Sequence, residues 1–268
     1  MKDDEAGQKR PAQRSATAPL TGDALERYAR HIVLHEIGGQ GQRRLAEARI
    51  AVVGAGGLGS PAILYLAAAG VGYLRVIDND TVALSNLQRQ VLFATEDVGR
   101  HKVSAAGDAV ARLNPLVTLD PVADRLIEGN ATALLACVDM VLDGSDSAAT
   151  RHVVNAAAVA LAIPLVSAAI GRWEGQVGVF DPANGGPCYA CAFPEAPDAD
   201  QVPACAEAGV LGAMAGVIGA MQAVEAVKLI VGSGTPLAGR LLLYDALEAE
   251  TRVLRIKRRP DCPVCGDV

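Results

Sequence analysis

The chain has 268 residues, of which 51% are hydrophobic and 20% charged, and its formal net charge is −6. This length and apolar content can bury a full core, which excludes a disordered chain, and six cysteines are too few for a disulfide-held secreted scaffold. The acidic balance argues against nucleic acid or an anionic membrane as the main partner.

The first twenty residues are polar and lack the apolar segment of a secretory signal. We expect residues 1–20 to be a disordered extension and the protein to be cytoplasmic. Residues 21–48 are expected to form an N-terminal helical segment, in which Thr21 caps the first helix and residues 38–41 form a glycine-rich linker.

Short apolar runs alternate with helical segments from residue 49 onward. Strands are expected at residues 50–53, 74–77, 117–119, 140–142 and 164–168, and helices from the first glycine loop to residue 69 and at residues 102–113, 131–137 and 148–161. Alternation of this kind gives parallel strands with right-handed crossovers. The pattern therefore predicts an α/β fold with a Rossmann-like, doubly wound, mainly parallel sheet over residues 49–170.

The last third, residues 171–268, follows a different pattern, which predicts a mixed or antiparallel extension of the same domain. Strands are expected at residues 176–180, 240–244 and 251–256. The apolar segment 208–224 favours a buried helix over a membrane span, because Gly212, Gly216 and Ala220 recur every four residues and suit close helix packing.

A glycine-rich loop directly follows the first expected strand. Gly54, Gly56 and Gly59 form a G-x-G-x-x-G motif, with Gly57 inside it, which lets backbone N–H groups approach a phosphate at a helix N-terminus. Asp78 ends the next strand, where a ribose-binding acid is expected. The motif indicates a nucleotide, and taken alone it leaves an NAD-dependent oxidoreductase or a plain tight turn open.

A polar cluster after the second strand carries more positive charge than a diphosphate needs. Its members are Asp80, Ser85, Asn86, Gln88, Arg89 and Lys102. The two cations suit a triphosphate that releases pyrophosphate. Asp146 follows the fourth strand and can hold Mg²⁺ through water. The structural alternatives are a surface salt bridge for Lys102 and a helix N-cap for Asp146.

Cysteine spacing predicts a metal site. Cys188 and Cys191 form one C-x-x-C knuckle, and Cys262 and Cys265 form another. Paired knuckles favour a closed, structural Cys₄ zinc site, with a redox-active C-x-x-C as the alternative. Two cysteines remain: Cys137 is expected to be a buried core thiol and Cys205 an exposed loop thiol.

Other catalytic patterns are missing from the sequence. The four histidines form no metal-binding motif, and no G-x-S-x-G elbow is present. A carboxylate that attacks a phosphate is already ionised and needs no general base. The sequence is thus compatible with nucleotidyl transfer to a carboxylate.

With these residues in hand, the chain resembles the MoeB, ThiF and HesA family of ubiquitin-activating-enzyme-like adenylyltransferases over residues 25–266. The segments that carry the resemblance are RYAR at 27–30, GAGGLG at 54–59, LSNLQRQ at 84–90, GRHK at 99–102, GSD at 144–146, GRWEGQ at 171–176, AEAGV at 206–210 and the paired knuckles. The LSNLQRQ segment together with the knuckles is highly specific.

The resemblance implies that the protein uses Mg²⁺ and ATP to adenylate the C-terminal glycine of a ubiquitin-like β-grasp sulfur-carrier protein ending in Gly-Gly. It implies an ATP site at Gly57, Asp78, Asn86, Arg89, Lys102 and Asp146. It also implies that residues 171–268 dock the carrier, and that Arg30 reaches into the site of the partner subunit in a homodimer. Ser147 stands where the family usually has Asn, and no sulfurtransferase domain follows the knuckles, so a separate sulfur donor is expected.

Within the family, the segments ERYARHIVL, PACAEAGVLGA and LLLYDAL favour the molybdopterin-synthase branch, and the thiamine branch remains an alternative. In the thiamine branch a cysteine at the position of Cys205 can form a covalent sulfur link with the carrier, whereas an inert loop thiol is the alternative here. A non-catalytic scaffold is a third hypothesis, and the intact Arg89, Lys102 and Asp146 argue against it.

Overall fold

Eight strands form one sheet in the order β3-β2-β1-β4-β5-β6-β7-β8. This computed structural model describes residue 20, residues 22–194 and residues 209–266. The strands are β1 (Arg49–Val53), β2 (Tyr73–Ile77), β3 (Thr118–Val122), β4 (Met140–Asp143), β5 (Leu165–Ile170), β6 (Glu174–Phe180), β7 (Arg240–Asp245) and β8 (Glu250–Arg255). Strands β1 to β5 pair in parallel and β5 to β8 pair antiparallel, which confirms the predicted doubly wound sheet with its extension.

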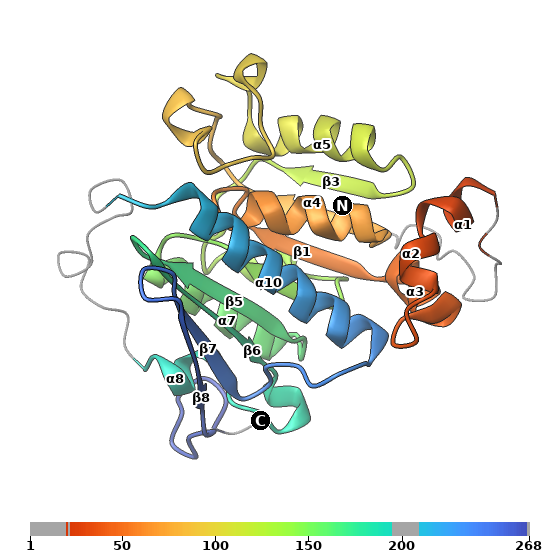
Figure 1. Cartoon of the computed structure of the whole chain (residues 1–268). Helices are drawn as coiled ribbons and strands as arrows, with labels where there is room; N and C mark the ends of the chain where they lie inside the picture. The colour runs from red at the N-terminus through yellow and green to blue at the C-terminus, as the bar shows by residue number, and fades with distance from the viewer. Residues whose placement is uncertain (1–19, 21, 195–208, 267–268) are drawn as a thin grey trace, which may run out of the picture.

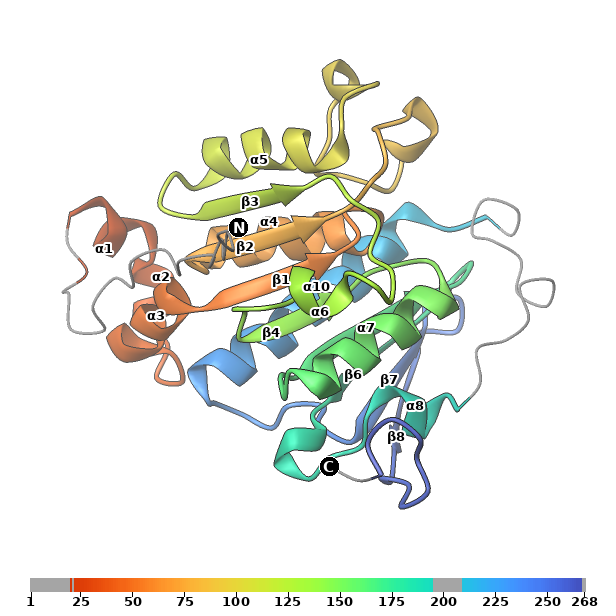
Figure 2. The same cartoon turned by 180° about the vertical axis from the view of Figure 1, so that it is seen from behind.

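Helices cover both faces of this sheet (Figures 1 and 2). They are α1 (Asp23–Arg27), α2 (Ala29–Ile32), α3 (Gly38–Glu47), α4 (Gly59–Ala69), α5 (Lys102–Leu113), α6 (Ala131–Leu134), α7 (Ala148–Ala160), α8 (Tyr189–Ala192) and α10 (Gly212–Val231). Helices α4, α5 and α10 bury the larger core against one face, and α6, α7 and α8 bury a second core against the other. The apolar strands β1 and β4 are buried on both sides, as parallel strands require.

Helix α10 packs against the loop after β2 and the start of α4 through small residues, but not through all those that the four-residue spacing predicted. A Cβ on Gly212 would lie 2.1 Å from the carbonyl oxygen of Gln88, and one on Gly219 would lie 2.4 Å from that of Leu58. Gly216 has no atom within 4 Å of such a Cβ. Seven residues make about two helical turns, so positions 212 and 219 share the inner face and position 216 turns away.

The same helix is long and apolar enough to cross a membrane by length and composition, and half of its most apolar window is buried inside the protein. Its buried face includes Met214, Ile218 and Gln222. The Gln222 amide donates hydrogen bonds to the carbonyl oxygens of Asp143 (2.8 Å) and Val166 (3.2 Å), which ties α10 to β4 and β5.

Three local predictions near the ends of elements were wrong. Residues 38–41 form the first turn of α3 instead of a linker, because Gly41 packs against Ile37 and Val231, and these contacts outweigh the low helix propensity of glycine. The helix expected at 131–137 ends at Leu134. Cys137 is exposed, with a positive φ of 62°, and is not a core thiol.

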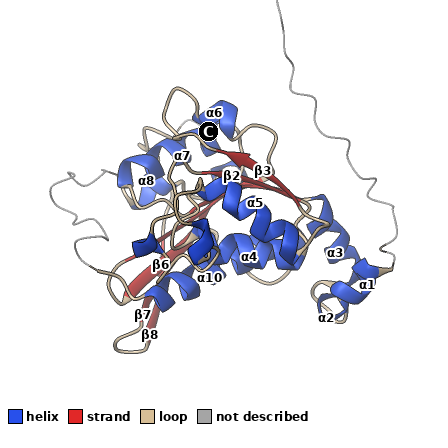
Figure 3. Ribbon diagram, turned by 90° about the horizontal axis from the view of Figure 1, so that it is seen from above, coloured by secondary structure: helices blue, strands red, loops and turns tan. Residues whose placement is uncertain are grey.

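Helix α1 begins with Gly22 at its N-cap position, and Thr21, the expected cap, lies outside the described residues. The predicted disordered extension also lies outside them, except for residue 20. Figure 3 shows α1 and α2 at one end of the molecule, away from β7 and β8.

Candidate active site

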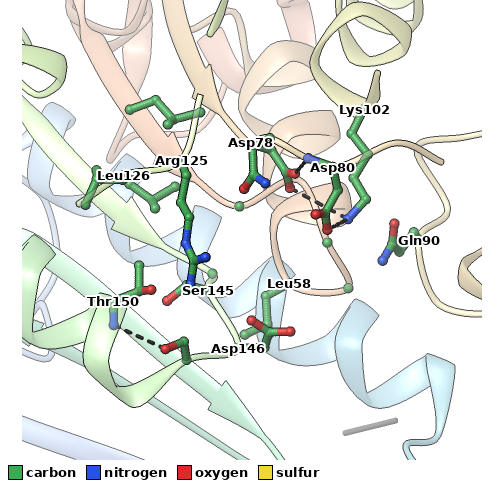
Figure 4. A pocket seen from close by; sticks show the side chains of 18 of the residues that line it. Leu58, Asp78, Asp80, Gln90, Lys102, Arg125, Leu126, Ser145, Asp146 and Thr150 are labelled. Carbon is green, nitrogen blue, oxygen red and sulfur yellow. Dashed lines mark hydrogen bonds and ion pairs between the residues drawn. The ribbon is translucent and has the colours of Figure 1, made fainter. Parts of the chain in front are cut away.

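A cavity of about 460 Å³ opens at the carboxyl edge of the sheet, between the loops that follow β1, β2, β3 and β4 (Figure 4). Ligands of doubly wound folds bind at this edge, and the volume lies in the range of small-molecule sites. The sequence-predicted residues that line it are Gly54, Gly56, Gly57, Asp78, Asp80, Asn86, Arg89, Lys102 and Asp146. The fold therefore assembles most of the expected nucleotide site from segments far apart in the chain.

Four other expected residues do not line this cavity. Ser85 contributes a backbone carbonyl that accepts a hydrogen bond from Arg89 Nη1 (3.0 Å). Gln88 lies against Gly212 at the start of α10, and Gly59 is the first residue of α4. Arg30 is exposed on α2, at the far end of the sheet from the cavity.

The glycines of the first loop serve two different purposes. Gly54 has a φ of +87°, which disfavours any side chain, and a Cβ on Gly59 would lie 1.9 Å from the carbonyl oxygen of Gly54. These two glycines let the turn close. A Cβ on Gly56 would meet only Gln90 Nε2, at 3.8 Å, so this glycine leaves room for a ligand.

Asp78 connects the loops on both sides of the cavity. Its Oδ2 accepts a hydrogen bond from the backbone N–H of Ala55 (2.7 Å), and its Oδ1 accepts one from the N–H of Asp80 (2.8 Å). The acid that was expected to meet a ribose therefore also holds the glycine loop against the loop after β2.

Lys102 is buried at the N-terminal end of α5, with 5% of its surface exposed. Its Nζ lies 2.7 Å from Asp80 Oδ2 and 3.8 Å from Asp78 Oδ2. Lys102 thus forms the salt bridge of the structural alternative, but its ammonium is buried and is part of the cavity wall instead of the outer surface. The Asp80 side chain is 61% exposed and that of Asp78 9%, so Lys102 is paired with one largely solvated carboxylate and lies near one nearly buried carboxylate.

The loop after β4 places one carboxylate in the core and another in the cavity. Asp143 is fully buried and accepts a hydrogen bond from the N–H of Ser145 (2.9 Å); burial raises the pKa of Asp143, and the nearby charge of Arg151 opposes this rise. Asp146 is exposed to the cavity. The N-cap of α7 is Ser147, whose hydroxyl accepts from the Thr150 N–H, so the N-cap interpretation of Asp146 is wrong.

The two cysteine knuckles meet in one buried cluster. The Sγ atom of Cys188 lies 3.9 Å from that of Cys191 and 3.6 Å from that of Cys262, and the Cys191 and Cys265 Sγ atoms are 3.5 Å apart. All four lie within 4.8 Å of one another. Thiolates around a tetrahedral zinc ion with 2.3 Å bonds are about 3.8 Å apart, so the donor set and its spacing fit zinc.

The cysteines of the cluster differ in their surroundings, since burial raises the pKa of Cys188 and Cys265. Burial raises the pKa of Cys262, but hydrogen bonds from the backbone N–H groups of Val264 and Cys265 outweigh it and lower this pKa to about 7. The backbone N–H of Arg259 points at Cys191 Sγ, at 3.5 Å. Cys205, the remaining cysteine of the sequence, lies outside the described residues.

Comparison with known proteins identifies the family of this chain. The ThiF family matches residues 28–264. A sulfur carrier protein adenylyltransferase of Thermus thermophilus is 50% identical over 251 residues, which cover 92% of this chain and 93% of that protein. The chain belongs to the ThiF family. A SAMP-activating enzyme E1 of Haloferax volcanii is 48% identical, covering 94% of this chain and 92% of that one.

Solved structures show that the ThiF-family chain has a known fold. The structure of E. coli MccB with ATP superimposes with a TM-score of 0.80 at 23% identity, over 90% of this chain and 75% of that one. The expected family and fold are thus confirmed. With these relatives the ThiF-family chain is an enzyme, a nucleotidyltransferase, and the oxidoreductase and scaffold hypotheses are set aside.

Several residues of this ThiF-family chain that line the cavity were not proposed as nucleotide-binding or catalytic residues from the sequence. They are Asn79, Gln90, Asp124, Arg125, Leu126, Ser145, Ser147, Thr150, Arg151, Ile170 and Val210. Thr150 and Arg151 could have been found, because they lie in the first turn of a helix expected after the fourth strand. Arg125 could not, since only the fold directs the loop after β3 across the cavity (Figure 4).

Proposed function

We propose that this protein uses ATP to adenylate the C-terminal glycine of a ubiquitin-like sulfur-carrier protein, with release of pyrophosphate. The observation that carries the proposal is the pairing of a glycine loop with Lys102 and Arg89 in one cavity. Among the described residues that line this cavity there is no histidine. A carboxylate nucleophile is already ionised, so the reaction needs positioning and charge neutralisation more than a general base.

In the proposed reaction a carboxylate oxygen of the carrier attacks the α-phosphorus of ATP. A new phosphorus–oxygen bond forms, the bond from the α-phosphorus to the bridging oxygen breaks, and its electrons leave with pyrophosphate. Lys102 and Arg89 would stabilise the charge that develops on the phosphates. The backbone of Gly56 and Gly57 would approach the phosphates, and Asp78 and Asn86 would orient the nucleoside.

Mg²⁺ is part of the proposal because Asp146 presents an exposed carboxylate to the same cavity. Oxygen ligands of this type are those that Mg²⁺ prefers, and the ion would neutralise the leaving pyrophosphate. Zinc is proposed for Cys188, Cys191, Cys262 and Cys265. Four protein ligands close its coordination shell, so the zinc would be structural.

The extension of the sheet offers a route for the carrier. A second cavity of about 460 Å³ is lined by residues of β5, β6, β7 and β8, among them Gln176 and Tyr244, and Ile170 lines both cavities. All residues of the edge strand β8 are exposed. We expect the body of the carrier to dock on this extension and its Gly-Gly tail to run past Ile170 to the nucleotide.

A homodimer is proposed because Arg30 cannot serve the cavity of its own chain. It is exposed on α2, at the opposite end of the sheet. The neighbouring helices α4 and α10 also expose large apolar side chains, with Tyr65 at 60% and Val224 at 56%. A partner subunit that covers this surface would bring its Arg30 to the nucleotide.

The finer identity of the carrier belongs to the proposal as well. We propose the small subunit of molybdopterin synthase, in molybdenum cofactor biosynthesis, with the thiamine-pathway carrier as the alternative and a separate sulfurtransferase as sulfur donor. The reaction would take place in the cytoplasm. Adenylation by itself needs no thiol, so Cys205 would act only afterwards, if it acts at all.

The decisive experiment incubates the protein with ATP, Mg²⁺ and each candidate carrier and measures the intact mass of the carrier. The expected product is an acyl-adenylate, whose mass gain is that of one AMP, on one carrier and not on a variant that lacks the terminal glycine. ATP–pyrophosphate exchange should likewise depend on the carrier. Exchange at full rate without any carrier would contradict the proposed function.

A further inference from the structure

Asn155 joins the cysteine cluster to helix α7. It lies on α7, with 1% of its surface exposed, and its Oδ1 accepts a hydrogen bond of 2.8 Å from the backbone N–H of Tyr189. Tyr189 directly follows Cys188 and begins α8. One turn further along α7, Val159 packs against the cysteine cluster, so this face of the helix is turned toward the knuckles.

The other end of the same amide lacks a good partner. Because Oδ1 receives the Tyr189 N–H, the orientation of the amide is fixed and Nδ2 points away from that N–H. Nδ2 is buried and makes no geometrically good hydrogen bond to any described residue. A buried donor without an acceptor is costly, and such groups call for an explanation.

The acceptor that fits is the sulfur of Cys188. The amide already holds the N–H of Tyr189, the residue that follows Cys188, and the Asn155 side chain interacts with the Cys188 sulfur. A metal-bound thiolate is a better acceptor than a thiol. Binding of the metal would therefore satisfy the Nδ2 donor.

We propose that Asn155 is a positioning residue of the metal centre, which donates an N–H to the Cys188 thiolate while holding the first turn of α8. This inference rests on the proposed zinc site. Donors outside the ligand shell stabilise a metal by fixing the ligand and its charge. The backbone N–H of Arg259, which points at Cys191 Sγ, is a second donor of this kind, for a second thiolate.

The position of Asn155 also connects the metal centre with the cavity. Thr150 and Arg151, on the first turn of the same helix, line the nucleotide cavity, and Arg151 Nη2 donates to the carbonyl oxygen of Ser145 (2.8 Å). A metal that fixes α8 against Asn155 thus fixes the helix that carries one wall of the cavity. Helix α7 is the element that links the two sites.

The test compares zinc affinity in variants of the full-length protein, measured by competition with a chromophoric chelator. Asn155→Asp keeps the acceptor for the Tyr189 N–H and replaces the donor by an anionic oxygen. A purely structural role would survive this change. We expect zinc affinity to fall about 10–100-fold, the usual effect of losing such a partner.

Asn114→Ala is the matched control, because it removes another buried asparagine amide, which donates to Tyr28 Oη (2.8 Å) and the Ala67 carbonyl (2.7 Å). It should lower thermal stability without changing zinc affinity. If Asn155→Asp does not fold, Asn155→Ala takes its place. In the Co²⁺-substituted protein, the sulfur-to-metal charge-transfer band should shift in the Asn155 variant only.

Wild-type zinc affinity in Asn155→Asp would overturn the inference, as would an equal loss in the Asn114 control. A wild-type protein that binds neither Zn²⁺ nor Co²⁺ at its cysteines would overturn the metal site itself. Carrier-dependent pyrophosphate exchange is measured separately, so failure of the proposed enzyme activity would be recognised as a different result.

Discussion

Lys102 and Asp143 are two charged side chains that the fold buries beside the cavity, for different reasons. Lys102 is stabilised by Asp80 and Asp78 and presents its ammonium to the ligand space. Asp143 points into the core, where one oxygen accepts the Ser145 N–H and the other has no partner among the described residues. Lys102 therefore lines the cavity, and Asp143 holds the loop that carries Asp146.

We expect Lys102→Ala to slow carrier-dependent ATP–pyrophosphate exchange by about 10²–10³-fold, because an electrostatic contact to the transition state is lost. The fold should survive, since Asp80 is largely exposed and can be solvated. Exchange kinetics measure the loss of rate, and thermal unfolding shows whether the fold is kept. Arg112→Ala, at an exposed cation in the last turn of the same helix, is the charge-matched control for folding. A rate within twofold of wild type would contradict the role of Lys102.

The pH dependence of stability should report on Asp143. Its folded-state pKa is raised above the ordinary 3.8, so the native state binds the proton more tightly than the unfolded state. The stability that this group contributes is therefore fully present below pH 3.8 and is lost as pH rises through the folded pKa. Compared with Asp143→Asn, the wild type should lose stability as pH rises from acid to neutral. The free energy of unfolding is measured by denaturant titration at several pH values. An equal change of this free energy with pH in the two proteins would disprove the expectation.

At the scale of elements, the phosphate loop is held between two neighbours. The Cβ of Ala215 on α10 would lie 3.2 Å from a Cβ at Gly57, and Gly219 packs against the Leu58 carbonyl. On the other side, Gly54 approaches the Gly144 carbonyl after β4. The loop conformation therefore depends on α10 and β4, which lie far away in the sequence.

Gly56 and Gly59 of the loop motif should respond differently to one added methyl group. Gly59→Ala brings a Cβ to 1.9 Å from a backbone oxygen, and we expect a loss of at least about 1–3 kcal/mol of stability. Gly56→Ala meets no atom closer than 3.8 Å, so stability should change by less than about 0.5 kcal/mol. Its nucleotide affinity should fall about tenfold or more, because the methyl group occupies the ligand space. Chemical denaturation measures the stability of each variant, and nucleotide titration measures its affinity. Equal losses of stability in the two variants would show that Gly56 and Gly59 do not differ in this way.

At the scale of the whole molecule, the cavity and the helices α1 and α2 lie at opposite ends of the strands. The cavity is at the carboxyl edge of the sheet, and α2, which carries Arg30, is at the other edge. A single chain therefore separates Arg30 from the phosphates that it is expected to meet. Two chains related by symmetry would bring them together and would bury the apolar side chains of α4 and α10.

Complementation tests this arrangement. Arg30→Ala should reduce turnover with little effect on stability, because the side chain is exposed. Mixing it with Lys102→Ala should restore part of the activity, since a hybrid dimer contains one intact site. Exchange of subunits is verified by mass spectrometry of tagged chains. Absence of rescue after verified exchange would rule out a shared site.

The elements that the sequence predicted well are those whose signal is local. The apolar runs of β1 and β4 correctly predicted strands, because parallel strands are buried on both faces. The helix predicted at residues 102–113 is α5. Local propensity failed at α3, where Gly41 is helical because Ile37 and Val231 pack on it. The turn at Cys137 also depends on contacts that the local sequence does not contain.

By itself the sequence determined which chemical groups are available: a glycine loop, two cations, an acid after the fourth strand and four paired cysteines, because residue types and their spacings are properties of the chain alone. Only the tertiary structure decided which of them meet. It buried Lys102 between two carboxylates, placed Arg125 and Arg151 in the same cavity and set Asn155 beside Cys188. Such contacts join residues distant in the chain, and the packing that forms them is a property of the whole fold.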